Sequence, residues 1–148
     1  MRVYDYMTQK VFTIRSDKKL FAAQEIMNWA RVRHIPVVDQ DNRLVGVVSH
    51  RDLLHASLSA IADPAPEVER KQFLSTIPIE KVMKTQVETI APGAPIQEAA
   101  KLMRTKKIGC LPVVENGKLV GIISEYDLLQ IVEEMPSSGK AAGPHRPL

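Results

Sequence analysis

The sequence repeats itself, and this duplication constrains the fold more than any other feature. His34–Asp39 returns as Cys110–Glu115, and Leu44–Ser49 returns as Leu119–Ser124, with one turn residue fewer in the second copy. Such a repeat predicts two similar structural units. Because a unit of this size buries too little apolar surface to be stable alone, we expect the two units to pack against each other.

Each copy has the pattern of a β-α-β-β-α unit. A short apolar β segment, Val11–Ile14 or Val87–Ile90, leads into a helix whose apolar residues recur at steps of three and four. Two strands follow, and Asn116-Gly117 between those of the second copy is a strong hairpin signal. The last helix begins after Ser49 or Ser124. The predicted fold class is α+β, with two β-α-β-β-α repeats packed through their sheets.

The repeat divides the chain into four predicted parts. These are a first repeat at 1–60, a linker at 61–78, a second repeat at 79–135 and a flexible tail at 136–148. In the linker, Asp63-Pro64-Ala65-Pro66 precedes Glu67–Leu74, which has the pattern of a short helix. The tail is rich in Ser, Gly, Pro and Ala, a composition that does not favour a packed core.

The composition is that of an ordinary globular protein, with 45% hydrophobic and 25% charged residues and a net charge of +3. Basic residues near the ends of the two equivalent helices could form a patch. Aromatic residues make up only 5% of the chain and do not interleave with them, which disfavours single-stranded nucleic acid as a partner. Cys110 is the single cysteine, so no internal disulfide can form. With no signal-like or membrane-spanning apolar run, we expect a cytoplasmic protein without a membrane partner.

The sequence contains no recognised catalytic or metal-binding motif. The patterns G-x-x-x-x-G-K-[ST], G-x-G-x-x-G, G-x-S-x-G and H-E-x-x-H are all absent from it. His50 and His55 are poorly spaced for sharing a metal on a helix, where i, i+4 is the usual arrangement. Cys110 and His34 occupy equivalent repeat positions and could be imagined as a thiol–base pair, but a small buried cysteine is the commoner role. We therefore expect neither an enzyme nor a metal protein.

The repeated pattern of Ile/Leu-Pro-Val-Val, an acidic turn, Leu-Val-Gly, two aliphatic residues and Ser-x-x-Asp-Leu-Leu resembles the cystathionine β-synthase (CBS) domain. The match covers about residues 3–55 and 79–133. The resemblance implies a tandem CBS pair, or Bateman module, whose repeats are related by a pseudo-twofold axis. It also implies an adenine nucleotide (AMP, ADP or ATP) or S-adenosylmethionine as regulatory ligand in clefts between the repeats, a homodimer, and an unidentified effector protein as the regulated partner.

The resemblance also implies which residues hold the ligand. The Ser-x-x-Asp of one repeat meets the first β segment and the pre-proline loop of the other. The first cleft would comprise Ser124, Tyr126, Asp127, Thr13, Ile14, Arg33, His34 and Pro36. The second would comprise Ser49, Arg51, Asp52, Thr89, Ile90, Gly109, Cys110 and Pro112. The chemistry is suitable, since a helix N-terminus favours phosphate and a carboxylate can accept hydrogen bonds from both ribose hydroxyls.

The two clefts are predicted to be unequal. Arg33 and His34 bring basic groups to the first cleft. The equivalent loop of the second cleft supplies no cation, so Arg51 would have to hold the phosphate there. We therefore expect Asp127→Ala to weaken nucleotide binding more than Asp52→Ala does.

The same residues also have a purely structural interpretation. Ser-x-x-Asp is a plain helix N-cap with an acidic first turn, although Asp is shorter than the Glu that usually completes a capping box. Thr13 and Thr89 can be simple strand formers. Arg33 and His34 can be solvated loop residues, and Gly109 can mark a close approach between the repeats. On this interpretation the protein is a constitutive dimerisation scaffold with ligand-free clefts.

Overall fold

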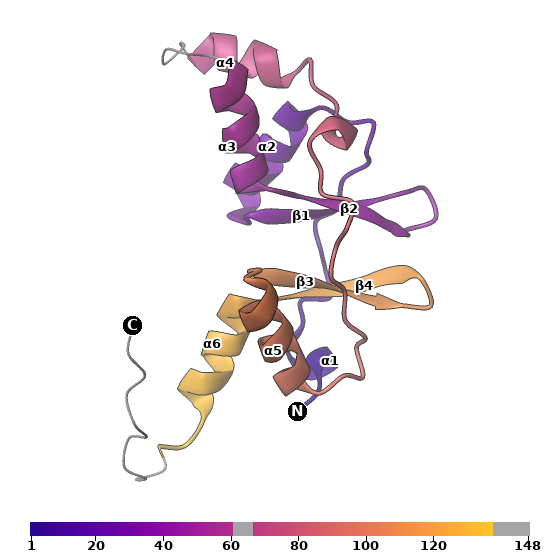
Figure 1. Cartoon of the computed structure of the whole chain (residues 1–148), viewed down its shortest axis with the longest axis vertical. Coiled ribbons are helices and arrows are strands. Elements are labelled where there is room, and N and C mark those ends of the chain that lie inside the picture. The colour runs from indigo at the N-terminus through magenta and orange to yellow at the C-terminus, as the bar shows by residue number, and fades with distance from the viewer. Residues whose placement is uncertain (61–66, 138–148) are drawn as a thin grey trace.

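The chain folds around two β-hairpins that face each other, with helices on the outer side of each (Figure 1). This computed structural model describes residues 1–60 and 67–137, and the side chains of all of these except 58–60 and 67–70. One hairpin pairs β1 (His34–Val38) with β2 (Leu44–Ser49), and the other pairs β3 (Cys110–Glu115) with β4 (Lys118–Ser124). The α+β class and the packing of the repeats through their sheets are therefore confirmed.

The described residues form six helices and one 3₁₀ turn, and of these the helix at 3–6 and the 3₁₀ turn were not predicted from the sequence. They are α1 (Val3–Tyr6), α2 (Leu20–Ala30), α3 (His50–Ala60), α4 (Glu67–Leu74), the 3₁₀ turn η1 (Ile79–Lys81), α5 (Ile96–Lys106) and α6 (Glu125–Glu134). The short helix expected inside the linker is confirmed as α4. The Asp63-Pro64-Ala65-Pro66 segment and the tail from residue 138 lie outside the described residues.

The hairpin turns follow from their residues. Asn116 and Gly117 both have positive φ, 52° and 79°, which is the backbone that a two-residue turn between twisted strands requires. The first hairpin has one more turn residue, and there the Asp39 carboxylate accepts hydrogen bonds from the backbone N–H groups of Asp41 and Arg43 at 2.8 and 3.0 Å. The Asn-Gly prediction is confirmed.

The β segments predicted at Val11–Ile14 and Val87–Ile90 are wrong as strands. Only their last residues pair with the sheets, in single parallel bridges from Ile14 to Val37 and from Ile90 to Val113. The backbone N–H of Ile14 donates to Pro36 at 3.1 Å, and its carbonyl accepts from Val38 at 3.0 Å. The pairing with each hairpin is therefore limited to the last residue of the segment, because the residues before it do not run along the hairpin edge.

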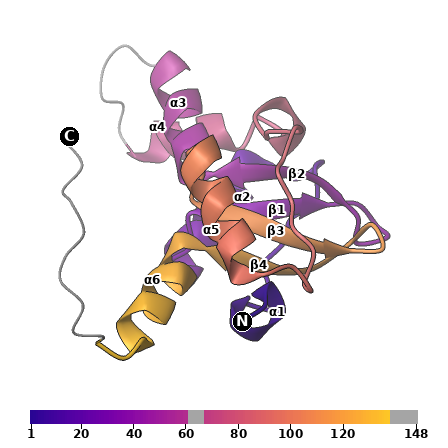
Figure 2. The same cartoon turned by 60° about the horizontal axis from the view of Figure 1, so that its bottom comes forward.

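Each repeat completes its core with a segment from the other repeat. Val3 of α1 is fully buried among the apolar residues of α5, β3 and β4, and Ile79 of η1 is fully buried among those of α2, β1 and β2. The exchange is fixed by backbone hydrogen bonds, from the Val3 N–H to Ala94 at 2.9 Å and from the Ile79 N–H to Lys18 at 2.8 Å. Figure 2 shows α1, in indigo, below β4 of the second hairpin. The two folded halves therefore do not coincide with the two sequence repeats.

The glycine of each repeated Leu-Val-Gly lies where an exchanged segment crosses the sheet. Thr8 forms an antiparallel bridge with Ile122 beside Gly121, and Lys84 forms one with Val47 beside Gly46. A Cβ on Gly121 would lie 2.9 Å from the Thr8 carbonyl oxygen, and one on Gly46 would lie 2.8 Å from the Lys84 carbonyl oxygen. Both positions therefore need glycine for close approach of two backbones.

Within residues 1–60 and 67–137, no helix has the length and apolarity that a membrane crossing needs.

Candidate functional site

Two cavities open between the repeats. The larger cavity has a volume of about 640 Å³ and lies where the start of α6 meets the segments before β1. The smaller cavity, of about 460 Å³, lies where the start of α3 meets the segments before β3. Both volumes fall in the range of about 300–1,000 Å³ that is usual for small-molecule sites.

Ser-x-x-Asp forms a complete capping box in each repeat. The backbone N–H of Ser124 donates to Asp127 Oδ2 at 2.7 Å, and its hydroxyl lies 3.1 Å from the same oxygen. The N–H of Ser49 likewise donates to Asp52 Oδ2 at 2.8 Å, and the N–H of Asp52 donates to Ser49 Oγ at 3.1 Å. The shorter Asp does not prevent this role, because the aspartate carboxylate reaches the cap backbone in both copies.

Capping leaves part of each carboxylate free for another partner. Asp127 uses Oδ2 for its hydrogen bonds, and its Oδ1 has no partner among the described residues. The same holds for Oδ1 of Asp52. A capped helix start with a fixed, half-buried carboxylate is therefore also a preorganised acceptor at the cavity wall.

The pre-strand loops are tied to the helix starts. The N–H of His50 donates to the Arg33 carbonyl at 2.8 Å, and the N–H of Glu125 donates to the Gly109 carbonyl at 3.0 Å. These bonds hold the loops that carry Arg33-His34 and Gly109-Cys110 between the two cavities. As a result, all four of these loop residues line both cavities, together with His50.

The structure brings most of the residues predicted for the first cleft to the larger cavity. These are Ser124, Tyr126, Asp127, Arg33 and His34. It does not bring Thr13, Ile14 or Pro36 there: Ile14 packs in the hydrophobic core of the first hairpin, and Pro36 is fully buried. Val11 and Phe12 line the cavity instead. Their role was missed because the chain turns into the sheet only at Ile14, so the cavity wall comes earlier in the sequence.

The smaller cavity follows the same pattern. Of the residues predicted for the second cleft, those that line it are Ser49, Arg51, Asp52, Gly109, Cys110 and Pro112. Thr89 and Ile90 do not, since Ile90 is buried in the core of the second hairpin. Val87 and Glu88 line it in their place.

The expectation that Arg51 is the only cation of the second cleft is wrong. Arg33, Lys84 and Lys107 also line the smaller cavity. Lys84 arrives there because its backbone bridges Val47, and Lys107 because it ends α5 in a left-handed conformation with φ 54°. In the larger cavity, Arg31 occupies the equivalent left-handed position after α2, with φ 55°. The basic residues at the ends of the two equivalent helices were the sequence signal that could have placed Arg31 and Lys107.

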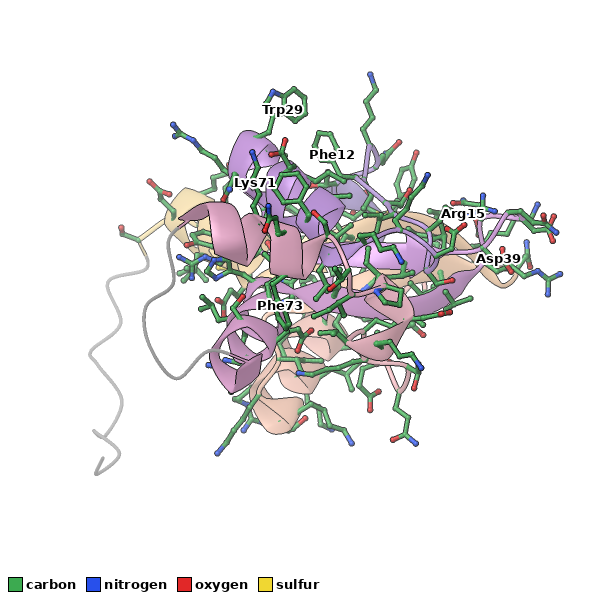
Figure 3. The ribbon with its side chains drawn as sticks, turned by 90° about the horizontal axis from the view of Figure 1, so that it is seen from above. Phe12, Arg15, Trp29, Asp39, Lys71 and Phe73 are labelled. Carbon is green, nitrogen blue, oxygen red and sulfur yellow. The ribbon has the colours of Figure 1, made fainter. Side chains whose placement is uncertain are left out.

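An aromatic pair distinguishes the larger cavity. Phe12 lines it, and its ring packs edge-on against Trp29, with 5.6 Å between ring centroids and an interplanar angle of 90°. Both rings lie together on one side of the molecule (Figure 3). At the corresponding site of the second repeat, Glu88 instead forms an exposed ion pair with Lys106 at 3.5 Å. The larger cavity therefore has the more apolar rim.

Two titratable groups in the shared wall are perturbed by burial. Burial raises the pKa of the Cys110 thiol to about 12, and the nearby Glu125 carboxylate adds to this effect. This thiol is therefore protonated at neutral pH and is a poor nucleophile. Burial also lowers the pKa of His34 below 6.5; the charges of Asp52 and Glu125 oppose this shift, and those of Lys84 and Arg33 reinforce it.

The lowered pKa of His34 predicts a loss of stability in mild acid. Because His34 takes up a proton in the unfolded chain at about pH 6.5 but at lower pH in the folded protein, the free energy of unfolding falls as pH drops below about 6.5. One proton contributes a slope of at most about 1.4 kcal/mol per pH unit. We expect His34→Asn to lose this part of the slope in urea unfolding curves recorded from about pH 8 to pH 5. An unchanged slope would show that other groups control the acid sensitivity.

Comparison with known proteins identifies the family. The CBS domain model matches residues 3–59 and 79–134, in the same two copies that form the two hairpins and their helices. The chain belongs to the CBS domain family. With two copies in tandem, it carries a CBS pair of the Bateman type, and of the described residues nearly all belong to that pair.

Relatives of similar length and fold are known. A CBS domain-containing protein of Dictyostelium discoideum is 35% identical over 131 residues, which cover 88% of this chain and 90% of that protein. The crystal structure of a Vibrio cholerae protein assigned to acetoin utilization (AcuB) is 37% identical, covers 90% of both chains and has a TM-score of 0.76. The structure of CBSX2 in complex with AMP is 25% identical, with a TM-score of 0.74, and covers 90% of this chain and 96% of that one. In each of the first two relatives, the part similar to this chain makes up 90% of the relative's own chain.

Proposed function

We propose that this protein is a regulatory module that binds an adenine nucleotide, of the AMP, ADP or ATP class or S-adenosylmethionine, in the cavities between its CBS repeats. The larger cavity carries the proposal, because it combines a fixed ribose acceptor, several cations and an apolar wall. The structure of CBSX2, a relative of this protein, was solved in complex with AMP, and this supports the choice of an adenosyl ligand. We propose a regulatory rather than a catalytic role; the single cysteine, Cys110, has a thiol that burial keeps protonated at neutral pH, which makes it a poor nucleophile.

Each part of a nucleotide has a suitable partner in the larger cavity. Oδ1 of Asp127 is positioned to accept from the ribose hydroxyls. Lys10, Arg31 and Arg33 offer donors to phosphate, and the guanidinium groups can do so with two parallel bonds. Val11 and Phe12 provide an apolar surface for the adenine ring.

The smaller cavity has the same parts with a different balance. Asp52 is the acceptor, and Arg51, Lys84 and Lys107 are cations that line this cavity and not the larger one. Its apolar wall is reduced, because Glu88 takes the place that Phe12 has in the larger cavity. We therefore propose it as a second nucleotide site that relies more on phosphate than on the base.

We further propose that the protein signals as a cytoplasmic homodimer or through an effector protein. Four apolar side chains recur every three residues along α6 and its C-cap, and each is half or more exposed: Tyr126, Leu129, Val132 and Met135. An exposed apolar row of this kind supports a contact with a second copy. A nucleotide that binds one arrangement of the dimer better than another would shift the equilibrium between them.

Thermal unfolding with candidate ligands tests the proposed function. At about 100 times its dissociation constant, a bound ligand should add about 2.7 kcal/mol of stability, which raises Tm by about 5–10 °C for a chain of this size. AMP, ADP, ATP and S-adenosylmethionine are compared with inorganic phosphate and GMP as controls. A rise with one or more of the first four supports the proposal. No rise with any of them favours the alternative function, a dimerisation scaffold whose capping boxes serve only the helix starts.

A further inference from the structure

The two cavities share one wall, and its basic groups all come from the first repeat. Arg33, His34, His50, Gly109 and Cys110 line both cavities. By the repeat, Gly109 corresponds to Arg33 and Cys110 to His34, so the second repeat contributes no basic side chain at these positions. A single set of basic side chains therefore faces both cavities.

The shared wall is held in place from both repeats. His34 begins β1 opposite Ser49, and its neighbour Arg33 accepts a backbone hydrogen bond from His50 at 2.8 Å. On the other side, a Cβ built on Gly109 would lie 3.6 Å from His34 Cε1 and 3.6 Å from Glu125 Oε1. The His34 ring thus packs across the boundary against the loop that carries Gly109. If this loop moved toward a ligand in one cavity, the shape of the other cavity would change as well.

The shared cations limit how well the two cavities can hold phosphate at the same time. A guanidinium group binds a phosphate best when both of its parallel bonds go to the same anion. Two phosphates placed on either side of the exposed Arg33 and the half-buried His34 would also repel each other, and the burial at His34 makes this repulsion stronger than in open water. The other cations are not shared, since Lys10 and Arg31 line only the larger cavity and Arg51, Lys84 and Lys107 line only the smaller one. They reduce the cost of binding two phosphates, but Arg33 and His34 remain common to both cavities.

We propose that the two cavities bind phosphate-bearing nucleotides with negative coupling, because both draw on Arg33 and His34. This inference rests on the proposed function, since it requires that both cavities bind nucleotide. Occupation of one cavity lowers the affinity of the other, and by linkage the effect is equal in both directions. The module then responds to nucleotide over a wider concentration range than two independent sites would.

Titration calorimetry with AMP and with adenosine tests the coupling. Arg31→Ala should weaken AMP binding in the larger cavity only, and Arg51→Ala in the smaller cavity only, so these matched variants assign the two binding steps. Arg33→Ala should weaken both. We expect the second AMP to bind wild type about tenfold more weakly than AMP binds the same cavity when Asp127→Asn or Asp52→Asn has weakened the other cavity, so that the other fills last. For adenosine, which lacks phosphate, the dissociation constants of the same cavity in wild type and in the variant should agree within about twofold.

The outcomes separate the coupling from the proposed function. If Arg33→Ala brings the two AMP dissociation constants of the same cavity within about twofold of each other, the shared arginine is the source of the coupling. If wild type binds two AMP molecules with the affinities measured for each cavity alone, the coupling is refuted while nucleotide binding stands. A chain that binds AMP only at the larger cavity in every variant also refutes it. Absence of any AMP or adenosine binding overturns the proposed function, and the coupling with it.

Discussion

Gly121→Ala should lower the free energy of unfolding by about 1–3 kcal/mol, the usual cost of overpacking a close contact. The new methyl group would lie 2.7 Å from Met7 Sδ and 2.9 Å from the carbonyl oxygen of Thr8. The methionine side chain can move, but the carbonyl cannot, because the N–H of Ile122 donates to it at 3.0 Å. The substitution therefore pushes the exchanged N-terminal segment away from β4. Urea unfolding monitored by far-UV circular dichroism would measure the loss.

Gly93→Ala is the matched control for this prediction. A Cβ at Gly93 has only the end of the Arg2 side chain near it, at 3.9 Å, and its backbone does not require positive φ. We expect its free energy of unfolding to stay within about 0.5 kcal/mol of wild type. Gly46→Ala should behave like Gly121→Ala, since its methyl group would lie 2.8 Å from the Lys84 carbonyl oxygen. Equal stability of all three variants would show that the crossing segments are not packed as described.

Asp127→Ala should weaken AMP binding at the larger cavity by about 30-fold. A hydrogen bond to a charged group contributes about 2 kcal/mol, and this substitution removes the acceptor proposed for the ribose hydroxyls. The same change also removes a capping interaction, because Asp127 Oδ2 accepts from the Ser124 N–H at 2.7 Å. It should therefore also cost about 1 kcal/mol of stability. Titration calorimetry gives the affinity, and thermal unfolding gives the stability.

Asp127→Asn separates the two roles of this residue. The amide oxygen of asparagine can still accept from the Ser124 N–H, so most of the capping should remain, while the negative charge that favours both ribose hydroxyls is lost. We expect near-normal stability and clearly weaker AMP binding. Asp52→Ala breaks the equivalent capping box at the smaller cavity and should leave AMP binding at the larger cavity unchanged. If Asp127→Asn bound AMP as wild type does, the carboxylate would have only a structural role.

Local patterns predicted the elements because they depend on short-range geometry. Apolar residues at steps of three and four placed α2 and α5, and Asn116-Gly117 placed the second turn, since few other residues adopt positive φ in succession. The same reasoning failed for Val11–Ile14, where Val11 and Phe12 line a cavity and only Ile14 pairs with the sheet. Hydrophobicity alone does not distinguish these two environments.

The candidate site was predicted in part. The Ser-x-x-Asp pairs and the Arg33-His34 step lie at the cavities, because they belong to helix starts and loops whose places follow from the repeat. Lys84 and Phe12 were missed, since each reaches its cavity through a segment that crosses from elsewhere in the chain. Their sequence neighbours contain no pattern that marks a binding site.

The sequence by itself determined that the chain contains two copies of one α+β unit, with the main helices, the hairpins and the places of the Ser-x-x-Asp helix starts in each. Only the tertiary structure decided which segment completes which core. Val3 and Ile79 occupy equivalent positions in the two copies and are both apolar, so either could enter either core as far as local pattern is concerned. The choice depends on the packing of the whole molecule, which buries Val3 in the second half and Ile79 in the first. That exchange also brings Lys84 to the smaller cavity.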